Sequence, residues 1–219
     1  MERIIIIGKG GHACSLVDLL EREKKYEIAG YIVNETLGTA DGKYPVIGND
    51  NDLERIFQSG IRHVALGIGY LGEPNKSAIR EKLWMDLKQI GFSFPVICDP
   101  SAVVSHDACI GEGTFIGKGA IVNTNASIGR MCILNTGAII EHGCQVGDFS
   151  HVSVGSVLCG DVSVGRSSFI GANATVIQGK TIGSDCVVGA GTVIRKNIKD
   201  GYMAWSRSDV IARDRLRKL

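Results

Sequence analysis

The sequence predicts a small parallel α/β domain followed by a parallel β-helix built from six-residue repeats. Three features support this prediction. Sixteen consecutive six-residue blocks, from Val104 to Lys199, all begin with Val, Ile or Leu. Glycine provides 29 of the 219 residues and proline only 4, which is typical of a closely packed, turn-rich chain. The residues before 96 instead combine short apolar runs, helical spacing and glycine-rich turns.

The six-residue period excludes a regular helix in this part of the chain, because the apolar face of a helix recurs every 3.6 residues. A short strand and a turn, repeated three times, close one coil of a triangular prism. Each leading aliphatic side chain then points inward and stacks on its counterpart in the next coil. The fifth place also points inward, near a corner, and holds Ala, Ser, Thr, Cys or Val in fourteen of the sixteen blocks. The repeats therefore predict about five coils with a core of small and aliphatic residues.

The N-terminal part of the chain predicts alternating strands and helices. Ile4–Ile7 is a buried-strand run, and a glycine-rich turn leads from it to the periodic stretch Ser15–Leu20. Glu27–Val33 and His63–Ile68 are predicted as the second and third strands, and Arg80–Ile90 has the apolar spacing of a helix. Strand, helix, strand and helix in this order indicate a parallel sheet.

We expect the domain boundary where the repeats begin. The predicted domains are an α/β domain at 1–97, a β-helix at 98–200 and a basic C-terminal tail at 201–219. From residue 195 onward the chain has eight basic and three acidic residues. This local excess could receive the phosphate groups of a ligand, or it could be a solvated tail.

The overall composition excludes several functions. With 24 basic and 23 acidic residues the net charge is +1, so no global field attracts nucleic acid or anionic lipid. The N-terminal apolar run is too short for a signal or a membrane span, so we expect a cytoplasmic protein without membrane contact. The seven cysteines form no C-x-x-C pair and are expected to be reduced thiols. No metal site is predicted.

The turn G-x-G-G-H-A at residues 8–13 follows the first strand and is a candidate phosphate-binding turn at a helix N-terminus. It fits the dinucleotide variant G-x-G-x-x-A, but the α/β domain is short for a full dinucleotide domain. The second strand also ends in Val33-Asn34 without an acidic residue. We therefore favour a nucleotide sugar over NAD, with a ligand-free turn as the alternative.

Two motifs together resemble a known family. The G-x-G-G-H-A turn and the segment from Asn135-Thr136 through Glu141-His142 to Ser153 are similar to bacterial sugar acetyltransferases with hexapeptide repeats. These include sialic acid O-acetyltransferases and the UDP-4-amino-sugar N-acetyltransferases of bacillosamine synthesis. The resemblance covers nearly the whole chain. It implies a left-handed β-helix, a homotrimer, acetyl-CoA bound between neighbouring prisms, and a nucleotide-linked amino sugar held by residues 1–97.

The same resemblance makes His142 the general base. A neutral imidazole suits removal of a proton from an attacking amine or hydroxyl, although a histidine at this place could also be an ordinary surface residue. In the bacillosamine enzymes the next residue is acidic and supports the base. Here it is Gly143, and the resulting E-H-G also occurs in sialate O-acetyltransferases. His151 matches a histidine that contacts acetyl-CoA in the bacillosamine enzymes, which favours the amino-sugar branch.

The other site residues follow from the resemblance position by position. The glycine-rich turns would contact the nucleotide sugar, and backbone groups on the coils would hold the pantetheine arm. An asparagine at a corner of the prism would orient the substrate or serve only the fold. The implied substrate-binding residues are Gly10, Gly11, His12, Asn34, Gly69 and Asn135, and the implied cosubstrate-binding residues are His151, Ala172 and Ala190.

The leading prediction is an acetyl-CoA-dependent N-acetyltransferase that acts on the amine of a nucleotide-linked 4-amino-4,6-dideoxy sugar. Direct attack on the thioester needs no acylated cysteine, and a backbone N–H would stabilise the oxyanion. O-acetylation of sialic acid by the same machinery is one alternative. A non-catalytic prism that serves as a sugar-binding scaffold is the alternative of a different class.

Overall fold

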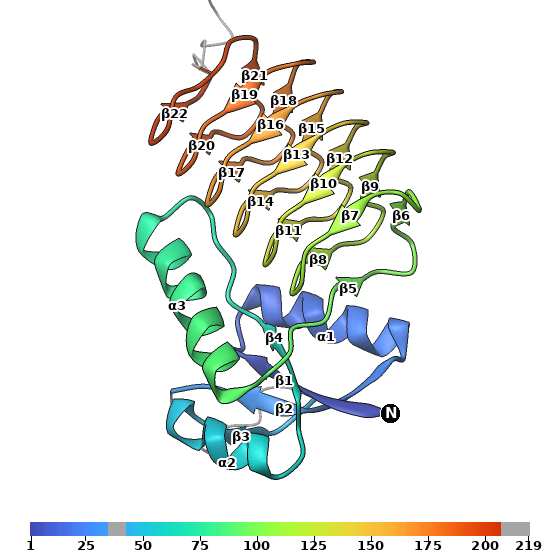
Figure 1. The fold of residues 1–219 in the computed structure, drawn as a ribbon, viewed down its shortest axis with the longest axis vertical. Helices are drawn as coiled ribbons and strands as arrows, with labels where there is room; N and C mark the ends of the chain where they lie inside the picture. Colours follow the sequence, from blue (N-terminus) through green and yellow to red (C-terminus); the bar gives the residue numbers. More distant parts are fainter. Residues whose placement is uncertain (35–42, 207–219) are drawn as a thin grey trace, which may run out of the picture.

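The structure of the protein is a computed structural model that describes residues 1–34 and 43–206. It has two parts in contact, an α/β domain and a long triangular prism of stacked coils (Figure 1). The predicted fold class, a small parallel sheet followed by a left-handed β-helix, is confirmed. Residues 207–219 of the predicted basic tail lie outside the described residues.

The α/β domain is built on a four-stranded parallel sheet with the order β3-β2-β1-β4. Ile5 and Ile7 of β1 pack with residues of α2 and α3, while Ile4 and Ile6 pack with residues of α1, which explains the unbroken apolar run. The sequence did not predict the short elements β3 and α2. The strands are β1 (Glu2–Ile7), β2 (Tyr26–Ile32), β3 (Val46–Gly48) and β4 (His63–Leu66), and the helices are α1 (Gly11–Glu23), the 3₁₀ turn Asp50–Asp52, α2 (Leu53–Gln58) and α3 (Pro74–Ile90).

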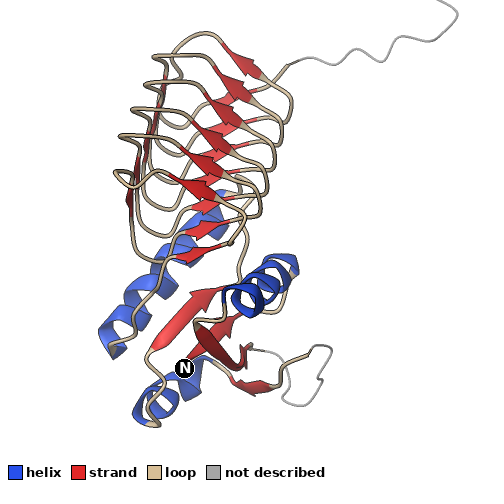
Figure 2. Cartoon of the chain, turned by 90° about the vertical axis from the view of Figure 1, so that its right-hand side faces the viewer, coloured by secondary structure: helices blue, strands red, loops and turns tan. Residues whose placement is uncertain are grey.

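The prism has three parallel sheets, which we call its first, second and third faces (Figure 2). The first face contains β5 (Ile97–Cys98), β8 (Phe115–Ile116), β11 (Ile133–Leu134), β14 (His151–Val152), β17 (Phe169–Ile170), β20 (Val187–Val188) and β22 (Met203–Ala204). The second contains β6 (Val103–Val104), β9 (Ile121–Val122), β12 (Ile139–Ile140), β15 (Val157–Leu158), β18 (Thr175–Val176) and β21 (Val193–Ile194). The third contains β7 (Cys109–Ile110), β10 (Ser127–Ile128), β13 (Gln145–Val146), β16 (Ser163–Val164) and β19 (Thr181–Ile182).

Stacking of identical places along the prism forms its core. On the second face Val122 pairs with Ile140 and Ile140 pairs with Leu158, so each partner lies 18 residues further along the chain. All three side chains are fully buried. Most fifth places are equally buried, including Ala138 and Cys144, which is why small side chains predominate there. The predicted repeat register is therefore the register of the structure.

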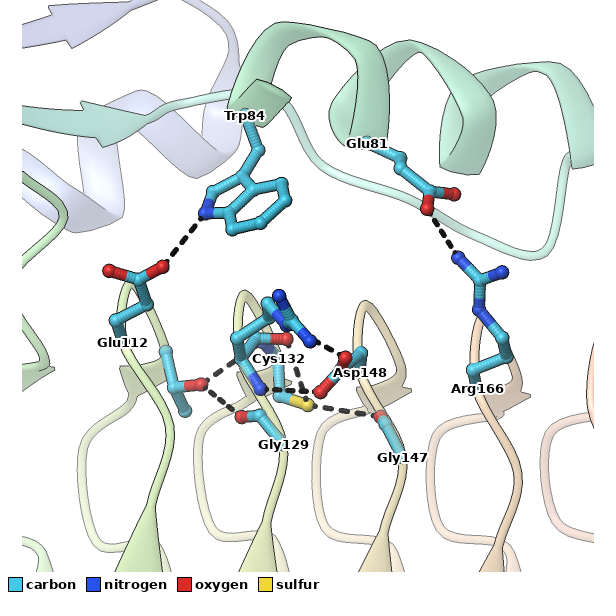
Figure 3. Close-up of polar contacts among 10 residues, drawn as sticks. Glu81, Trp84, Glu112, Gly129, Cys132, Gly147, Asp148 and Arg166 are labelled. Atoms are coloured by element: carbon cyan, nitrogen blue, oxygen red, sulfur yellow. Dashed lines mark hydrogen bonds and ion pairs between the residues drawn. The ribbon is translucent and has the colours of Figure 1, made fainter. Parts of the chain in front are cut away.

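Helix α3 holds the α/β domain against the turns that lead from the third face to the first (Figure 3). Glu81 accepts a hydrogen bond from Arg166 at 2.6 Å, and Trp84 Nε1 donates to Glu112 at 3.2 Å. Buried apolar residues of α3 and of these turns belong to one cluster. The two parts of the molecule therefore share a core as well as polar contacts. In the described part of the chain, no helix combines the length and the apolar character needed to cross a membrane.

Candidate active site

The glycine-rich turn after β1 leaves the N-terminus of α1 open. Gly8 has a φ of +88°, which L side chains rarely adopt, and Gly10 caps the helix without a side-chain hydrogen bond. A Cβ atom added at Gly10 or Gly11 would meet no atom within 4 Å. The first turn of the helix has no acidic residue. The helix dipole and the first backbone N–H groups therefore face open space, an arrangement that binds anions such as phosphate.

Two pockets meet at this turn. The distal pocket has a volume of about 770 Å³ and lies at the carboxyl ends of β1 and β2, against α3. The interdomain pocket has a volume of about 490 Å³ and lies between the α/β domain and the first face of the prism. Gly8, Gly10 and Ile68 line both pockets. A ligand that fills both would cross the N-terminus of α1 with its middle part.

The distal pocket combines apolar walls with a polar pair at the end of β2. Val33 and Leu83 are among its apolar lining residues. Asn34 Nδ2 donates to Asp50 Oδ2 at 2.7 Å, and the Asp50 backbone N–H donates to Asn34 Oδ1 at 3.3 Å. The predicted residue Asn34 therefore lies in a pocket, where Asp50 holds its side chain in place. Asp50 was not among the site residues predicted from the sequence.

The interdomain pocket contains two histidines that are neutral near pH 7. Burial, together with smaller contributions from the nearby Arg80 and His151, lowers the pKa of His12 to about 3. Burial also lowers the pKa of His151 to about 4, against the hydrogen bond to Tyr70, which raises it. The His12 ring stands edge-on to Phe115 with 4.9 Å between the ring centres. The pocket thus presents uncharged hydrogen-bonding rings between the two parts of the molecule.

The contacts of His151 determine which of its nitrogens holds the proton. His151 Nδ1 lies 2.5 Å from the Tyr70 carbonyl oxygen, which can only accept, so Nδ1 is the donor. In the neutral ring Nε2 is then the acceptor, and Asn135 Nδ2 lies 3.3 Å from it. Asn135 Oδ1 accepts from the Thr136 backbone N–H at 2.8 Å, which fixes the amide orientation. His151 therefore holds Asn135 in one orientation at the edge of the pocket.

Two residues that sequence reasoning missed connect the α/β domain to the prism at this point. Tyr70 is 2% exposed, and its hydroxyl donates to the Ser167 carbonyl at 2.5 Å. Arg80 is 1% exposed, and its Nη2 donates to the Met131 carbonyl at 2.8 Å. Both contacts join residues more than fifty positions apart, so no local sequence pattern marks them. The only signal was the position of Tyr70 directly after the predicted glycine-rich turn.

His142 lies elsewhere, on the corner between the second and third faces. Its side chain is 52% exposed and lines neither the distal nor the interdomain pocket. The ring packs over Gly160, where an added Cβ would lie 2.5 Å from His142 Cε1. Asp161 Oδ1 lies 4.0 Å from His142 Nδ1, and the adjacent Glu141 accepts from the His142 backbone N–H at 3.3 Å. The imidazole is thus open to a ligand that approaches from outside the chain.

The structure divides the predicted site residues into four groups. Asn34 lies in the distal pocket and His142 on the corner after the second face. Ala172 and Ala190 lie in successive turns of the corner after the first face, where the Ala172 carbonyl accepts from the Gly191 backbone N–H at 2.8 Å. In the described ranges no group of His, Cys, Asp and Glu could hold a metal ion. The residues brought together in the interdomain pocket are Gly10, Gly11, His12, Gly69, Asn135 and His151.

Comparison with known protein families gives two matches. Residues 3–87 match the PglD N-terminal domain. Residues 108–142 and 161–196 match the hexapeptide repeat of succinyl-transferase. No curated protein matches the chain.

Several solved structures are similar over nearly the whole chain. A histidine variant of perosamine N-acetyltransferase from Caulobacter crescentus, in complex with CoA and GDP-perosamine, is 32% identical with a TM-score of 0.86, covering 95% of this chain and 98% of that one. The acetyltransferase domain of PglB from Neisseria gonorrhoeae is 31% identical with a TM-score of 0.84, covering 94% and 97%. WeeI from Acinetobacter baumannii, at 20% identity and a TM-score of 0.76, shares the fold.

Proposed function

Because the chain belongs to the family of hexapeptide-repeat sugar acetyltransferases, we propose that it transfers the acetyl group of acetyl-CoA to the amine of a nucleotide-linked 4-amino-4,6-dideoxy sugar. It is an acetyltransferase with acetyl-CoA as cosubstrate. Similar enzymes were solved with CoA and GDP-perosamine, a nucleotide sugar, which supports this substrate class.

The single observation that best supports a nucleotide sugar is the pair of pockets joined at the N-terminus of α1. A nucleoside would occupy the distal pocket, whose volume is about 770 Å³. The diphosphate would cross Gly10 and Gly11, where backbone N–H groups are open. The sugar would enter the interdomain pocket beside His12 and Asn135. Free sialic acid has no nucleotide part and would leave the distal pocket empty.

We assign proton removal to His142. As the sugar amine attacks the thioester carbonyl carbon, a C–N bond forms and the imidazole takes the proton from the nitrogen. When the C–S bond breaks, the proton leaves with the CoA thiolate as a thiol. The transfer needs no covalent acyl-enzyme. Half of the imidazole surface is exposed, so the base is accessible to both substrates.

The placement of these parts on different corners supports a site shared between two chains. The sugar pocket borders the first face of the prism, whereas His142 follows the second face. We propose that a neighbouring copy in a homotrimer supplies His142 to the sugar bound by the first copy. Acetyl-CoA would lie in the cleft between the two prisms, along the corner of Ala172 and Ala190. His151 would act there by holding Asn135 rather than by a free ring nitrogen, because both nitrogens have partners.

An assay of acetyl transfer to a panel of sugars tests this proposal. The panel contains GDP-, UDP- and dTDP-linked 4-amino-4,6-dideoxy sugars together with free sialic acid and the matching free amino sugars. We expect N-acetylation of at least one nucleotide-linked amino sugar, with kcat/KM at least about 100-fold above that for the free sugar, because binding of the remote nucleotide contributes to transition-state stabilisation. Turnover of sialic acid alone would point to O-acetylation. Absence of turnover with every compound would support a scaffold.

A further inference from the structure

We propose that Asp161 is the carboxylate partner of His142 and replaces the acidic residue that position 143 lacks. This inference rests on the proposed role of His142 as the general base. Asp161 belongs to the next coil, on the same corner of the prism. Its Oδ1 lies 4.0 Å from His142 Nδ1. Its backbone N–H donates to the His142 carbonyl at 2.9 Å, so the fold itself places the carboxylate beside the ring.

The contacts of Gly143 explain why this position is a glycine. Gly143 has a φ of +68°, and a Cβ atom added to it would lie 2.3 Å from Asp161 Oδ1. The carboxylate of Asp161 thus occupies the space that a side chain at 143 would need. A carboxylate beside the His142 ring can therefore come from a side chain at position 143 or from one at position 161. In this chain it comes from Asp161.

Among the described residues around His142, Asp161 is the one whose carboxylate faces the imidazole ring. Glu141 directs Oε2 to the His142 backbone N–H, at 3.3 Å, and not to the imidazole. Gly160 covers one side of the ring and brings no charge. Asp107, further along the same corner, accepts hydrogen bonds from the turn that contains Thr124.

A carboxylate on the Nδ1 side of the ring has two effects on a general base. It favours the tautomer with the proton on Nδ1, which leaves the lone pair on Nε2 for the incoming proton. It also stabilises the imidazolium that forms when the sugar amine is deprotonated. At 4.0 Å the contact is too long for a hydrogen bond and becomes an ion pair only when the imidazole is protonated, and both side chains are about half exposed. We therefore expect a modest effect.

A second pair in the prism, Gly155 and Asn173, has the same packing as Gly143 and Asp161 but no charge. Asn173 has a φ of +54°, close to the +59° of Asp161. Its Oδ1 would lie 2.3 Å from a Cβ atom added at Gly155, just as Asp161 Oδ1 covers Gly143. A neutral amide thus performs the same packing elsewhere in the fold. Asp161→Asn should keep the turn intact and remove only the charge.

The first test is the pH dependence of kcat/KM for Asp161→Asn in the full chain. The acid limb should move to lower pH, because the imidazole loses its anionic neighbour. Above this limb kcat should fall about two- to tenfold with an unchanged melting temperature. Asp185→Asn is the matched control. Asp185 has a φ of +53° and donates its N–H to the Arg166 carbonyl at 2.9 Å, but lies on another corner.

The second test transfers the carboxylate to position 143. Because both positions are left-handed, each accepts Gly or Asp. The double variant Gly143→Asp/Asp161→Gly should return the acid limb and kcat to within about twofold of the wild type. The single variant Gly143→Asp should fall outside this twofold range, because Asp161 fills the space that the new side chain needs. The proposal is overturned if Asp161→Asn has the pH profile of the wild type and of Asp185→Asn.

The ¹⁵N chemical shifts of the His142 ring distinguish failure of this proposal from failure of the proposed function, because they report which ring nitrogen carries the proton and need no turnover. The share of the tautomer with the proton on Nδ1 should be smaller in Asp161→Asn than in the wild type at the same pH, and equal shares would contradict the pairing. If the shares differ but no nucleotide-linked amino sugar is acetylated, the pairing stands and the assigned reaction fails.

Discussion

Gly11 is the first residue of α1 and borders open space, and the proposed diphosphate can bind there only if no negative charge lies beside it. Gly11→Asp should raise the KM for the nucleotide sugar by about 10- to 100-fold, because the added carboxylate repels phosphate at the helix N-terminus. An acidic residue in the first turn favours the helix, so the melting temperature should not fall. Gly11→Ser is the control of similar size. Equal KM values for the two variants, measured by steady-state kinetics, would contradict binding of the diphosphate at this turn.

His151 has both ring nitrogens engaged, so its replacement should act through Asn135. His151→Ala is expected to lower kcat about tenfold or more and to leave the KM for acetyl-CoA within about threefold. In an Asn135→Ala background the same substitution should lower kcat much less, because the amide that His151 orients is no longer present. Steady-state kinetics of the two single variants and the double variant test this. A rise in the KM for acetyl-CoA with unchanged kcat would instead make His151 a direct contact of the cosubstrate.

The lowered pKa values of His12 and His151, about 3 and about 4, also predict a pH dependence of stability. The folded state binds these protons more weakly than the unfolded chain, in which the ordinary histidine value of 6.5 applies. Their contribution to the free energy of unfolding is therefore complete above pH 6.5 and is lost as the pH falls toward 4. Thermal melting between pH 7 and pH 4 should show this loss. The double variant His12→Gln/His151→Gln should show a shallower loss, and an equal slope would contradict the burial of both rings.

At the scale of the structural element, the strands of the prism depend on an unbroken apolar ladder. Ile140 is fully buried between Val122 and Leu158. Ile140→Asp should lower the free energy of unfolding by several kcal/mol, since it buries an unpaired carboxylate. Gln145→Asp, at an exposed outward position of the next strand, is the control and should be nearly neutral. Denaturant unfolding compares the two, and similar midpoints would mean that the repeat register is wrong.

The elements differ in how much of them the sequence could predict. The ladder around Ile140 was predictable because the period is local and repeats sixteen times. Strand β3 has three residues and α2 has six, too few for a period to appear. Tyr70 and Asp161 were not predictable, because their partners come from other coils or from the other part of the molecule. His12 and Asn135 were found through the family motif, and only the structure placed them in one pocket.

At the scale of the whole molecule, the proposed shared site predicts a homotrimer, because His142 lies away from the interdomain pocket of its own chain. Light scattering at micromolar concentration should give three times the 23.4 kDa mass of the chain. A species of 23.4 kDa alone would contradict the trimer and would leave the base remote from the pocket in every molecule. A site shared between two chains would then not exist.

Complementation between two inactive variants tests the central claim, acetyl transfer at a site shared by two chains, most directly. His142→Ala alone should lower kcat by about 10²- to 10⁴-fold while acetyl-CoA still binds. Gly11→Asp alone should lose activity at low sugar concentration. Co-expressed in equal amounts, the two chains should form some interfaces with an intact pocket from one chain and an intact His142 from the other. Random mixing gives about a quarter of the wild-type activity. Activity no higher than the mean of the two separate variants would contradict a shared site.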